Sequence, residues 1–246
     1  MRIGLLADLH ANRQATEACL AALASTGCQR WVFLGDLVGY GADPEWTVDC
    51  VREYVERGAL AVRGNHDAAI GAAAPESANA DIRASIRWTR ERLDPSQRAF
   101  LESMPLLVED EDRLYVHASA WEPDQWAYVS NPLAAKRSLA ATTHWLTLCG
   151  HVHAPALYYE QGHSVCHFEP RAGVAIPLSS QRRWLAIPGS CGQPRDGNPA
   201  ASCAWFDIDT RTIAFLRVPY DHTRSAAAIR AAGLPASFAD RLERGT

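Results

Sequence analysis

Two pairs of polar residues in this sequence are each separated by a single position. Asp8 and His10 form one pair, and His151 and His153 form the other. In an extended backbone, residues two apart point to the same face, so each pair is expected to aim at one pocket. Carboxylate oxygens and imidazole nitrogens bind divalent ions such as Mn, Fe and Zn. The two pairs therefore indicate a metal site.

Three further residues with suitable donor atoms, Asp36, Asn65 and His117, each follow a short apolar run. If these runs are neighbouring strands, the three side chains lie at the carboxyl ends of the strands. Ligands bind at this edge in open α/β sheets. We therefore expect all seven side chains to converge, although they are far apart in the sequence.

The elements that must position these residues can be read from the apolar pattern. The first 70 residues alternate between short apolar runs and amphipathic stretches, which predicts a parallel sheet with covering helices. The expected strands are 3–7, 31–34 and 60–62, and the expected helices are 13–25 and 45–56.

The later part of the chain predicts helices and then mostly strands. Residues 71–104 are Ala-rich and are expected to form a helical insertion, with Asp81 and Asp94 as N-caps and Pro95 starting a second helix. Two sheets packed face to face are expected from the strands that follow, and two helices close the chain within 220–246. The expected strands are 106–108, 114–116, 145–148, 157–159, 184–187 and a hairpin over 203–218, and the closing helices are 224–231 and 235–242.

Composition limits the classes of protein to consider. A chain of 246 residues with 48% hydrophobic residues is expected to form a single domain, 1–246, with a substantial core. The net charge of -4 offers no basic face for a polyanion, so nucleic acid is not expected as a partner. No apolar run approaches the length of about 20 residues that a membrane helix needs, so no membrane association is expected. The oligomeric state stays open.

The seven cysteines are scattered and form no C-x-x-C pair. Neither a disulfide framework nor a structural zinc site is indicated, and a cytoplasmic location is expected. Cys149 and Cys191 flank motif loops. Buried thiols are the favoured interpretation for both, and contact with a metal is the alternative.

The polar blocks occur in an order that resembles a known family, the calcineurin-like metallophosphoesterases. The likeness spans residues 8–153, and a Pro/Gly-rich run at 188–197 extends it toward a small prokaryotic branch of phosphodiesterases. The blocks are Asp8-Leu9-His10, Gly35-Asp36, Gly64-Asn65-His66-Asp67, Val116-His117 and Gly150-His151-Val152-His153.

The resemblance implies a fold, cofactors and roles. The fold would be α/β (α+β), a four-layer α/β/β/α sandwich with two mixed sheets. Two divalent metal ions would bind, manganese by expectation, with iron, zinc or nickel as alternatives. Asp36 would bridge the ions, His66 would be the catalytic imidazole and Asp67 would orient its ring. One ion would be held by Asp8, His10, Asp36 and His153, and the other by Asp36, Asn65, His117 and His151.

Residues that could bind substrate are more ambiguous. Arg195 lies in a Pro/Gly-rich loop, where it could serve turn geometry or clamp a phosphate. Tyr40 lies in the glycine-rich run 35–41, which could form a tight turn, approach substrate, or do both. Trp121, Trp126 and Tyr128 could form an aromatic wall for a flat group or pack their own loop.

The implied activity is metal-dependent hydrolysis of a phosphoester, by a phosphodiesterase or phosphatase, on a small molecule or nucleotide. A protein Ser/Thr phosphatase is an alternative. It is disfavoured because those enzymes usually have an Asp-Arg-Gly where this sequence has Gly39-Tyr40-Gly41. A non-catalytic scaffold on the same fold is a further alternative. It is disfavoured because all eight polar positions of the motifs are intact.

Overall fold

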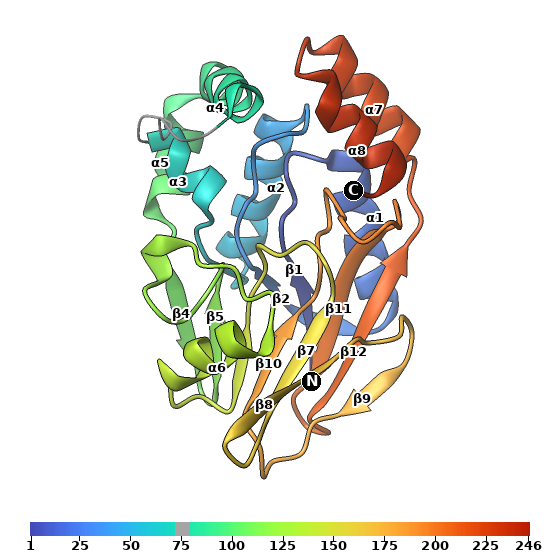
Figure 1. Cartoon of the computed structure of the whole chain (residues 1–246). Coiled ribbons are helices and arrows are strands. Elements are labelled where there is room, and N and C mark those ends of the chain that lie inside the picture. Colours follow the sequence, from blue (N-terminus) through green and yellow to red (C-terminus); the bar gives the residue numbers. More distant parts are fainter. Residues whose placement is uncertain (72–78) are drawn as a thin grey trace.

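Two six-stranded sheets pack face to face in the computed structural model (Figure 1), which describes residues 1–71 and 79–246. The first sheet has the order β3-β2-β1-β11-β12-β9, with β1, β2 and β3 parallel and β11 antiparallel to β1. Its strands are β1 (Arg2–Leu6), β2 (Cys28–Phe33), β3 (Leu60–Ala61), β9 (Ala175–Pro177), β11 (Ala201–Asp207) and β12 (Thr212–Val218).

The second sheet has the order β4-β5-β6-β10-β7-β8 and is also mixed, since β6 is parallel to both β5 and β10 while β7 is antiparallel to β10. Its strands are β4 (Leu107–Asp110), β5 (Arg113–Val116), β6 (Leu146–Leu148), β7 (Ala156–Gln161), β8 (Ser164–Phe168) and β10 (Trp184–Ile187).

Helices cover the outer faces of both sheets, so the expected four-layer α/β/β/α sandwich is confirmed (Figure 1). Helices α1 and α2 lie on the first sheet and α6 lies on the second, while α7 and α8 pack together beside α1. The helices are α1 (Arg13–Ser25), α2 (Pro44–Glu56), α3 (Asn65–Gly71), α4 (Ala80–Arg92), α5 (Pro95–Ser103), α6 (Pro132–Ala140), α7 (His222–Ala231) and α8 (Ala236–Arg244). Among the described residues, every helix is too short or too polar to cross a bilayer.

Strand β1 shows why an apolar run at the amino terminus forms a central strand. Ile3 and Leu5 are fully buried between the two sheets, whereas Leu6 faces the helical layer. Side chains alternate across a strand, so a strand buried on both faces must be apolar throughout. A fully buried side chain of this size stabilises the fold by about 1.5–3 kcal/mol.

The caps of the helices follow the sequence with one exception. Asp94 caps α5 in a capping box with Gln97, and Pro95 occupies the first position of the helix. The prediction of Asp81 as an N-cap is wrong, because Asn79 accepts the hydrogen bond from the Ile82 N–H and Asp81 lies inside the first turn. Part of the predicted 71–104 insertion, residues 72–78, lies outside the described residues.

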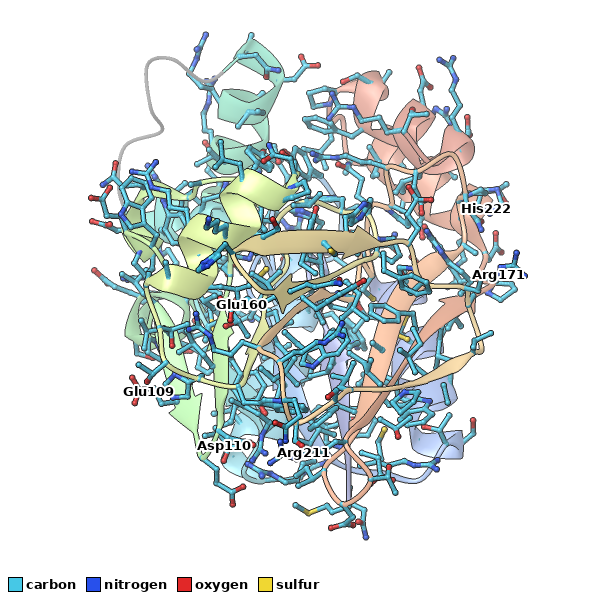
Figure 2. The ribbon with its side chains drawn as sticks, turned by 60° about the horizontal axis from the view of Figure 1, so that its bottom comes forward. Glu109, Asp110, Glu160, Arg171, Arg211 and His222 are labelled. Atoms are coloured by element: carbon cyan, nitrogen blue, oxygen red, sulfur yellow. The ribbon has the colours of Figure 1, made fainter. Side chains whose placement is uncertain are left out.

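A cluster of ion pairs joins the two sheets at the end of β5 opposite to His117. The buried guanidinium of Arg113 pairs with Asp112 at 2.9 Å and with Asp110 at 3.3 Å. Arg30 of the first sheet pairs with Asp110, and Arg211 pairs with Asp112. Figure 2 labels Asp110 and Arg211 at this end of the molecule. These ion pairs connect the two sheets at this end of the molecule. The candidate site residues lie at the opposite edge of the sheets.

We expect Leu148→Ala to lower the free energy of unfolding by about 2–5 kcal/mol, because Leu148 is fully buried between the sheets and its removal leaves a cavity. Leu133→Ala is the matched control. Leu133 is 77% exposed, so the same truncation should change the free energy by less than about 0.5 kcal/mol. Urea unfolding measures both, and equal losses would contradict the assigned core.

Candidate metal centre

The predicted site residues lie beyond the carboxyl ends of neighbouring strands. Asp8 follows β1, Asp36 follows β2, Asn65 follows β3, His117 follows β5 and His151 follows β6. Backbone hydrogen bonds join the loops that carry them: the Asp8 N–H donates to Gly35 and the His10 N–H donates to Asp36. The His151 N–H donates to the Asp8 carboxylate at 3.0 Å. The loops therefore form one connected edge, as the sequence predicted.

The expectation that the two residue pairs lie in extended backbone was wrong. Asp8 and His10 are not in extended backbone: their φ angles are 53° and 48°. His151 and His153 have φ angles of 68° and 67°. These residues point inward because each loop turns through the left-handed region. Eleven residues other than glycine have a positive φ in the described part of the chain, and these four are among them. Such conformations cost about 1–3 kcal/mol each, a cost that functional sites commonly carry.

Three groups of side chains in the described residues are close enough to hold a metal ion. Their donor atoms lie within 4.8 Å of one another inside each group, and all are buried. Asn65 adds an oxygen, since its Oδ1 lies 3.2 Å from His117 Nε2. The structure thus brings all seven predicted side chains together, while their roles as ligands stay a prediction. The groups are Asp8, His10 and His153; Asp36, His117 and His151; and His10, Asp36 and His66.

Asp36 lies between the groups. Its Oδ2 is 3.4 Å from His117 Nε2 and 3.8 Å from His10 Nε2. Its Oδ1 accepts the backbone N–H of His66 at 2.8 Å. The side chain is 1% exposed, so only these neighbours and any bound cation can balance its charge. One carboxylate is therefore placed to serve two ions.

Backbone carbonyls fix which nitrogen of three imidazoles is available. Nδ1 of His10 donates to Val38 at 3.1 Å, and Nδ1 of His153 donates to Gln193 at 2.6 Å. His117 Nδ1 donates likewise, to Leu34 at 2.7 Å. Because a carbonyl can only accept, the neutral ring carries its hydrogen on Nδ1 and presents a bare Nε2.

The bare nitrogens of His10 and His153 face each other. Their Nε2 atoms are 3.2 Å apart, and His153 Nε2 is 3.4 Å from an Asp8 oxygen. Two acceptors cannot form a hydrogen bond with each other, and a cation bound by both nitrogens would satisfy this arrangement. The oxygen and imidazole donors fit a divalent ion of the Mn, Fe or Zn type.

Buried charge shifts the pKa of these groups strongly in the metal-free protein. Burial raises the pKa of Asp8 to about 7, although His117 opposes the shift. Burial alone would lower the pKa of His117, but the Asp36 carboxylate outweighs it and raises that pKa to about 9. Burial lowers the pKa of His10 and His153. Without metal, the centre therefore keeps a proton on His117.

His66 lies beside the possible ligands. Its ring centroid is 5.1 Å from that of His10 and 4.5 Å from that of Tyr40. Gly39 allows this approach, because a Cβ there would come within 2.5 Å of His66 Nδ1, and its φ of 89° also favours glycine. Burial lowers the pKa of His66, so the ring is neutral near pH 7.

Asp67 does not orient the His66 ring as expected. Its Oδ1 accepts the Leu37 N–H at 2.9 Å and the Val38 N–H, and its Oδ2 accepts the Gly64 N–H at 2.9 Å. His66 Nδ1 has no hydrogen-bond partner among the described residues. Asp67 therefore holds the loop beyond Asp36, which carries the carbonyl that anchors His10.

The three candidate substrate-binding residues surround the same centre. Tyr40 is buried, and the guanidinium carbon of Arg195 lies 5.6 Å from its ring centroid. Arg195 Nη2 donates to the Gln193 side chain at 2.8 Å, while its buried Nε has no partner in the described chain. The ring centroid of Trp126 lies 5.9 Å from that of His117.

The two flanking thiols are buried apart from the possible ligands. Cys149 and Cys191 are fully buried, and neither belongs to the groups found in the described residues. Burial raises the pKa of Cys149 well above its usual range. These observations agree with packing roles for both cysteines.

Several contacts of the site had no signal in the sequence. The carbonyls of Leu34, Val38 and Gln193 anchor the imidazoles, and any residue type offers a carbonyl. Tyr128 stacks on His151 with 4.0 Å between ring centroids. The sequence suggested an aromatic wall here but not which ring would touch the centre.

Comparison with known proteins identifies the family. A model described as the calcineurin-like phosphoesterase superfamily domain matches residues 1–211. The chain belongs to this superfamily. The chain is similar to an uncharacterized protein of Methanocaldococcus jannaschii, 31% identical over 248 residues, which cover 99% of this chain and 98% of the relative.

Two solved structures match the chain over its whole length. A metallophosphoesterase from Sphaerobacter thermophilus is 35% identical with a TM-score of 0.90, covering 100% of this chain and 99% of that chain. A hypothetical protein from Pyrococcus horikoshii is 19% identical with a TM-score of 0.79, covering 100% and 98%. The second likeness shows the fold alone.

We expect the metal-free protein to release protons when it binds Mn²⁺. The pKa of His117 is about 9 without metal, so below that pH the ion must displace a proton. The apparent affinity should therefore rise between about pH 7 and about pH 9, by at most about tenfold per pH unit for one proton. Calorimetry at several pH values measures the affinity, and repeating it in two buffers of different ionisation enthalpy measures the proton release. Equal Mn²⁺ affinities at about pH 7 and about pH 9, with no proton release, would contradict this electrostatic account.

Proposed function

We propose that this phosphoesterase hydrolyses a phosphodiester or phosphomonoester in a small molecule or nucleotide, with two divalent metal ions as cofactors. The observation that carries the proposal is the convergence of buried donors on Asp36, with bare imidazole nitrogens facing each other across 3.2 Å. Such a set of donors is stable when a cation completes it.

The residues would divide between two ions that share Asp36. Manganese is the proposed metal, and iron, zinc or nickel would also suit these donors. When bound, the ions supply Lewis acidity to the phosphoryl oxygens and activation of the attacking water. One ion would be held by Asp8, His10, Asp36 and His153, and the other by Asp36, Asn65, His117 and His151.

The charge of the protein donors explains why a phosphoester would bind. Asp8 and Asp36 contribute two negative charges, and the other five donors are neutral once His117 has lost its proton. Against two divalent ions this leaves a surplus of about +2. An anionic ester is therefore attracted to the centre, although the chain as a whole carries a net charge of -4.

His66 is the residue we assign to proton transfer. Its backbone N–H is held by Asp36 at 2.8 Å, and its ring is confined between His10 and Tyr40. In its neutral form the ring can donate an N–H hydrogen bond to the departing oxygen, and in its protonated form it can give that oxygen a proton. A positioned group of this kind contributes about 10²–10⁴ in rate. Asp67 would act as a positioning residue, through the loop that it holds.

Arg195 is the residue we assign to binding a phosphoryl oxygen. Its guanidinium lies over Tyr40, and its buried Nε donor has no partner in the described residues. Leaving a buried donor unpaired costs free energy, and an anionic oxygen of the substrate would satisfy it. Gln193, which accepts from Arg195 and also anchors His153, fixes the guanidinium relative to the centre.

The alternative of a protein Ser/Thr phosphatase lacks this support. Those enzymes usually have a phosphate-binding arginine at the position that Tyr40 occupies in this chain. Its ring is buried against His10, His66 and Phe238. The only guanidinium we place at the centre therefore comes from Arg195, on a different loop.

We expect metal-stripped protein to hydrolyse bis-p-nitrophenyl phosphate or p-nitrophenyl phosphate only after Mn²⁺ is added back. His66→Ala should keep its bound metal and lose about 10²–10⁴ in turnover, because it removes a proton donor and no ligand. Release of p-nitrophenol and metal analysis measure the two properties, and the ratio of the rates reports preference for diester or monoester.

The matched control is Asp36→Ala, which removes the shared carboxylate and should lose metal together with activity. Full turnover without added metal, or unchanged turnover in His66→Ala, would contradict the proposal.

A further inference from the structure

A cavity adjoins the candidate metal centre. It has a volume of 560 Å³, within the range of cavities that hold small organic ligands. It lies between the segment that follows His117 and helix α6. Its lining residues are Ser119, Trp121, Ala127, Tyr128, Asn131, Leu133, Ala134, Lys136, Arg137 and Ala140.

Tyr128 connects this cavity to the centre. Its ring stacks on His151 with centroids 4.0 Å apart and planes 22° apart, yet 54% of the residue is exposed. One face of the Tyr128 ring therefore packs on His151, and the exposed part of the residue is available for stacking by a second flat group. Trp121 is the other aromatic side chain of the lining.

The charge of the cavity is opposite to that of the chain. Lys136 and Arg137 belong to the lining, and no carboxylate does among the described residues. The Arg137 guanidinium lies 3.1 Å from the Trp121 ring centroid, and Lys136 Nζ donates to the His163 carbonyl. Lys136 is also the only lysine in the sequence. A chain of net charge -4 thus presents two cations beside two aromatic rings.

We propose that this cavity holds the planar base of a nucleotide substrate while its phosphoester lies at the metal centre. The inference rests on the proposed function and makes the substrate a nucleoside phosphoester. Stacking on Tyr128 would bind the base, since every nucleobase offers a flat face to an aromatic ring. Lys136 and Arg137 would favour ligands that carry negative charge.

Two esters with the same leaving group separate the cavity from the chemistry. Thymidine 5′-(p-nitrophenyl phosphate) and methyl p-nitrophenyl phosphate differ only in the group that stays on phosphorus. We expect kcat/KM to favour the thymidine ester by about tenfold or more, through a lower KM. Leu133→Glu adds a carboxylate to the cavity lining at a residue that is 77% exposed, and it should abolish this preference.

The matched control is Val174→Glu, which adds the same charge at a residue that is 49% exposed and outside the cavity lining. It should keep the preference. Equal kcat/KM for the two esters in the unmodified protein would overturn the inference and leave the proposed function intact. Hydrolysis of neither ester in the presence of bound Mn²⁺ would instead contradict the proposed function.

The single lysine allows a second test that does not depend on turnover. With Mn²⁺ bound, thymidine 5′-monophosphate should slow acetylation of Lys136 by about fivefold or more, while methyl phosphate should not, because it lacks a base. Mass spectrometry follows Lys136, with the amino terminus as an internal reference. Equal rates of Lys136 acetylation with either ligand would overturn the placement of the base.

Discussion

The buried carboxylate of Asp36 is the group around which the other parts of the site are arranged. It follows β2, faces His117 and His10, and accepts the backbone N–H of His66. A carboxylate removed from water is costly unless cations or hydrogen bonds surround it. In the metal-free protein the proton on His117 provides part of that balance. A pair of divalent ions would provide it fully, and this explains why so many acceptor atoms are gathered in one buried place.

The two sheets hold these acceptors in position from both sides. The first sheet supplies Asp8, Asp36 and Asn65, while the second supplies His117 and the loop of His151. Hydrogen bonds between the loops, together with the apolar core between the sheets, prevent one half from shifting against the other. The Asp67 carboxylate performs a similar task inside the first sheet, where it gathers three backbone N–H groups. Rigid placement of this kind is what a preorganised site requires.

The sequence predicted the fold well where burial dictates the pattern. Helix α1 and strand β10 were predicted to the residue, because apolar periodicity follows directly from their buried faces. Helices α3 and α6 and strands β8 and β9 were missed. Strand β8 lies at a sheet edge with exposed or half-exposed residues, so its sequence lacks an apolar run. Residue types also identified the donors of the site. They could not reveal the left-handed turns that aim Asp8 and His153, nor the carbonyl that anchors each imidazole.

The most direct test of the shared carboxylate is the anomalous scattering of Mn²⁺ in crystals of the protein. The account predicts two peaks separated by about 3.5–4 Å, with Asp36 in contact with both. One ion should also contact His10 and His153, and the other should contact His117 and His151. A single peak, or two peaks of which neither touches Asp36, would contradict the central claim.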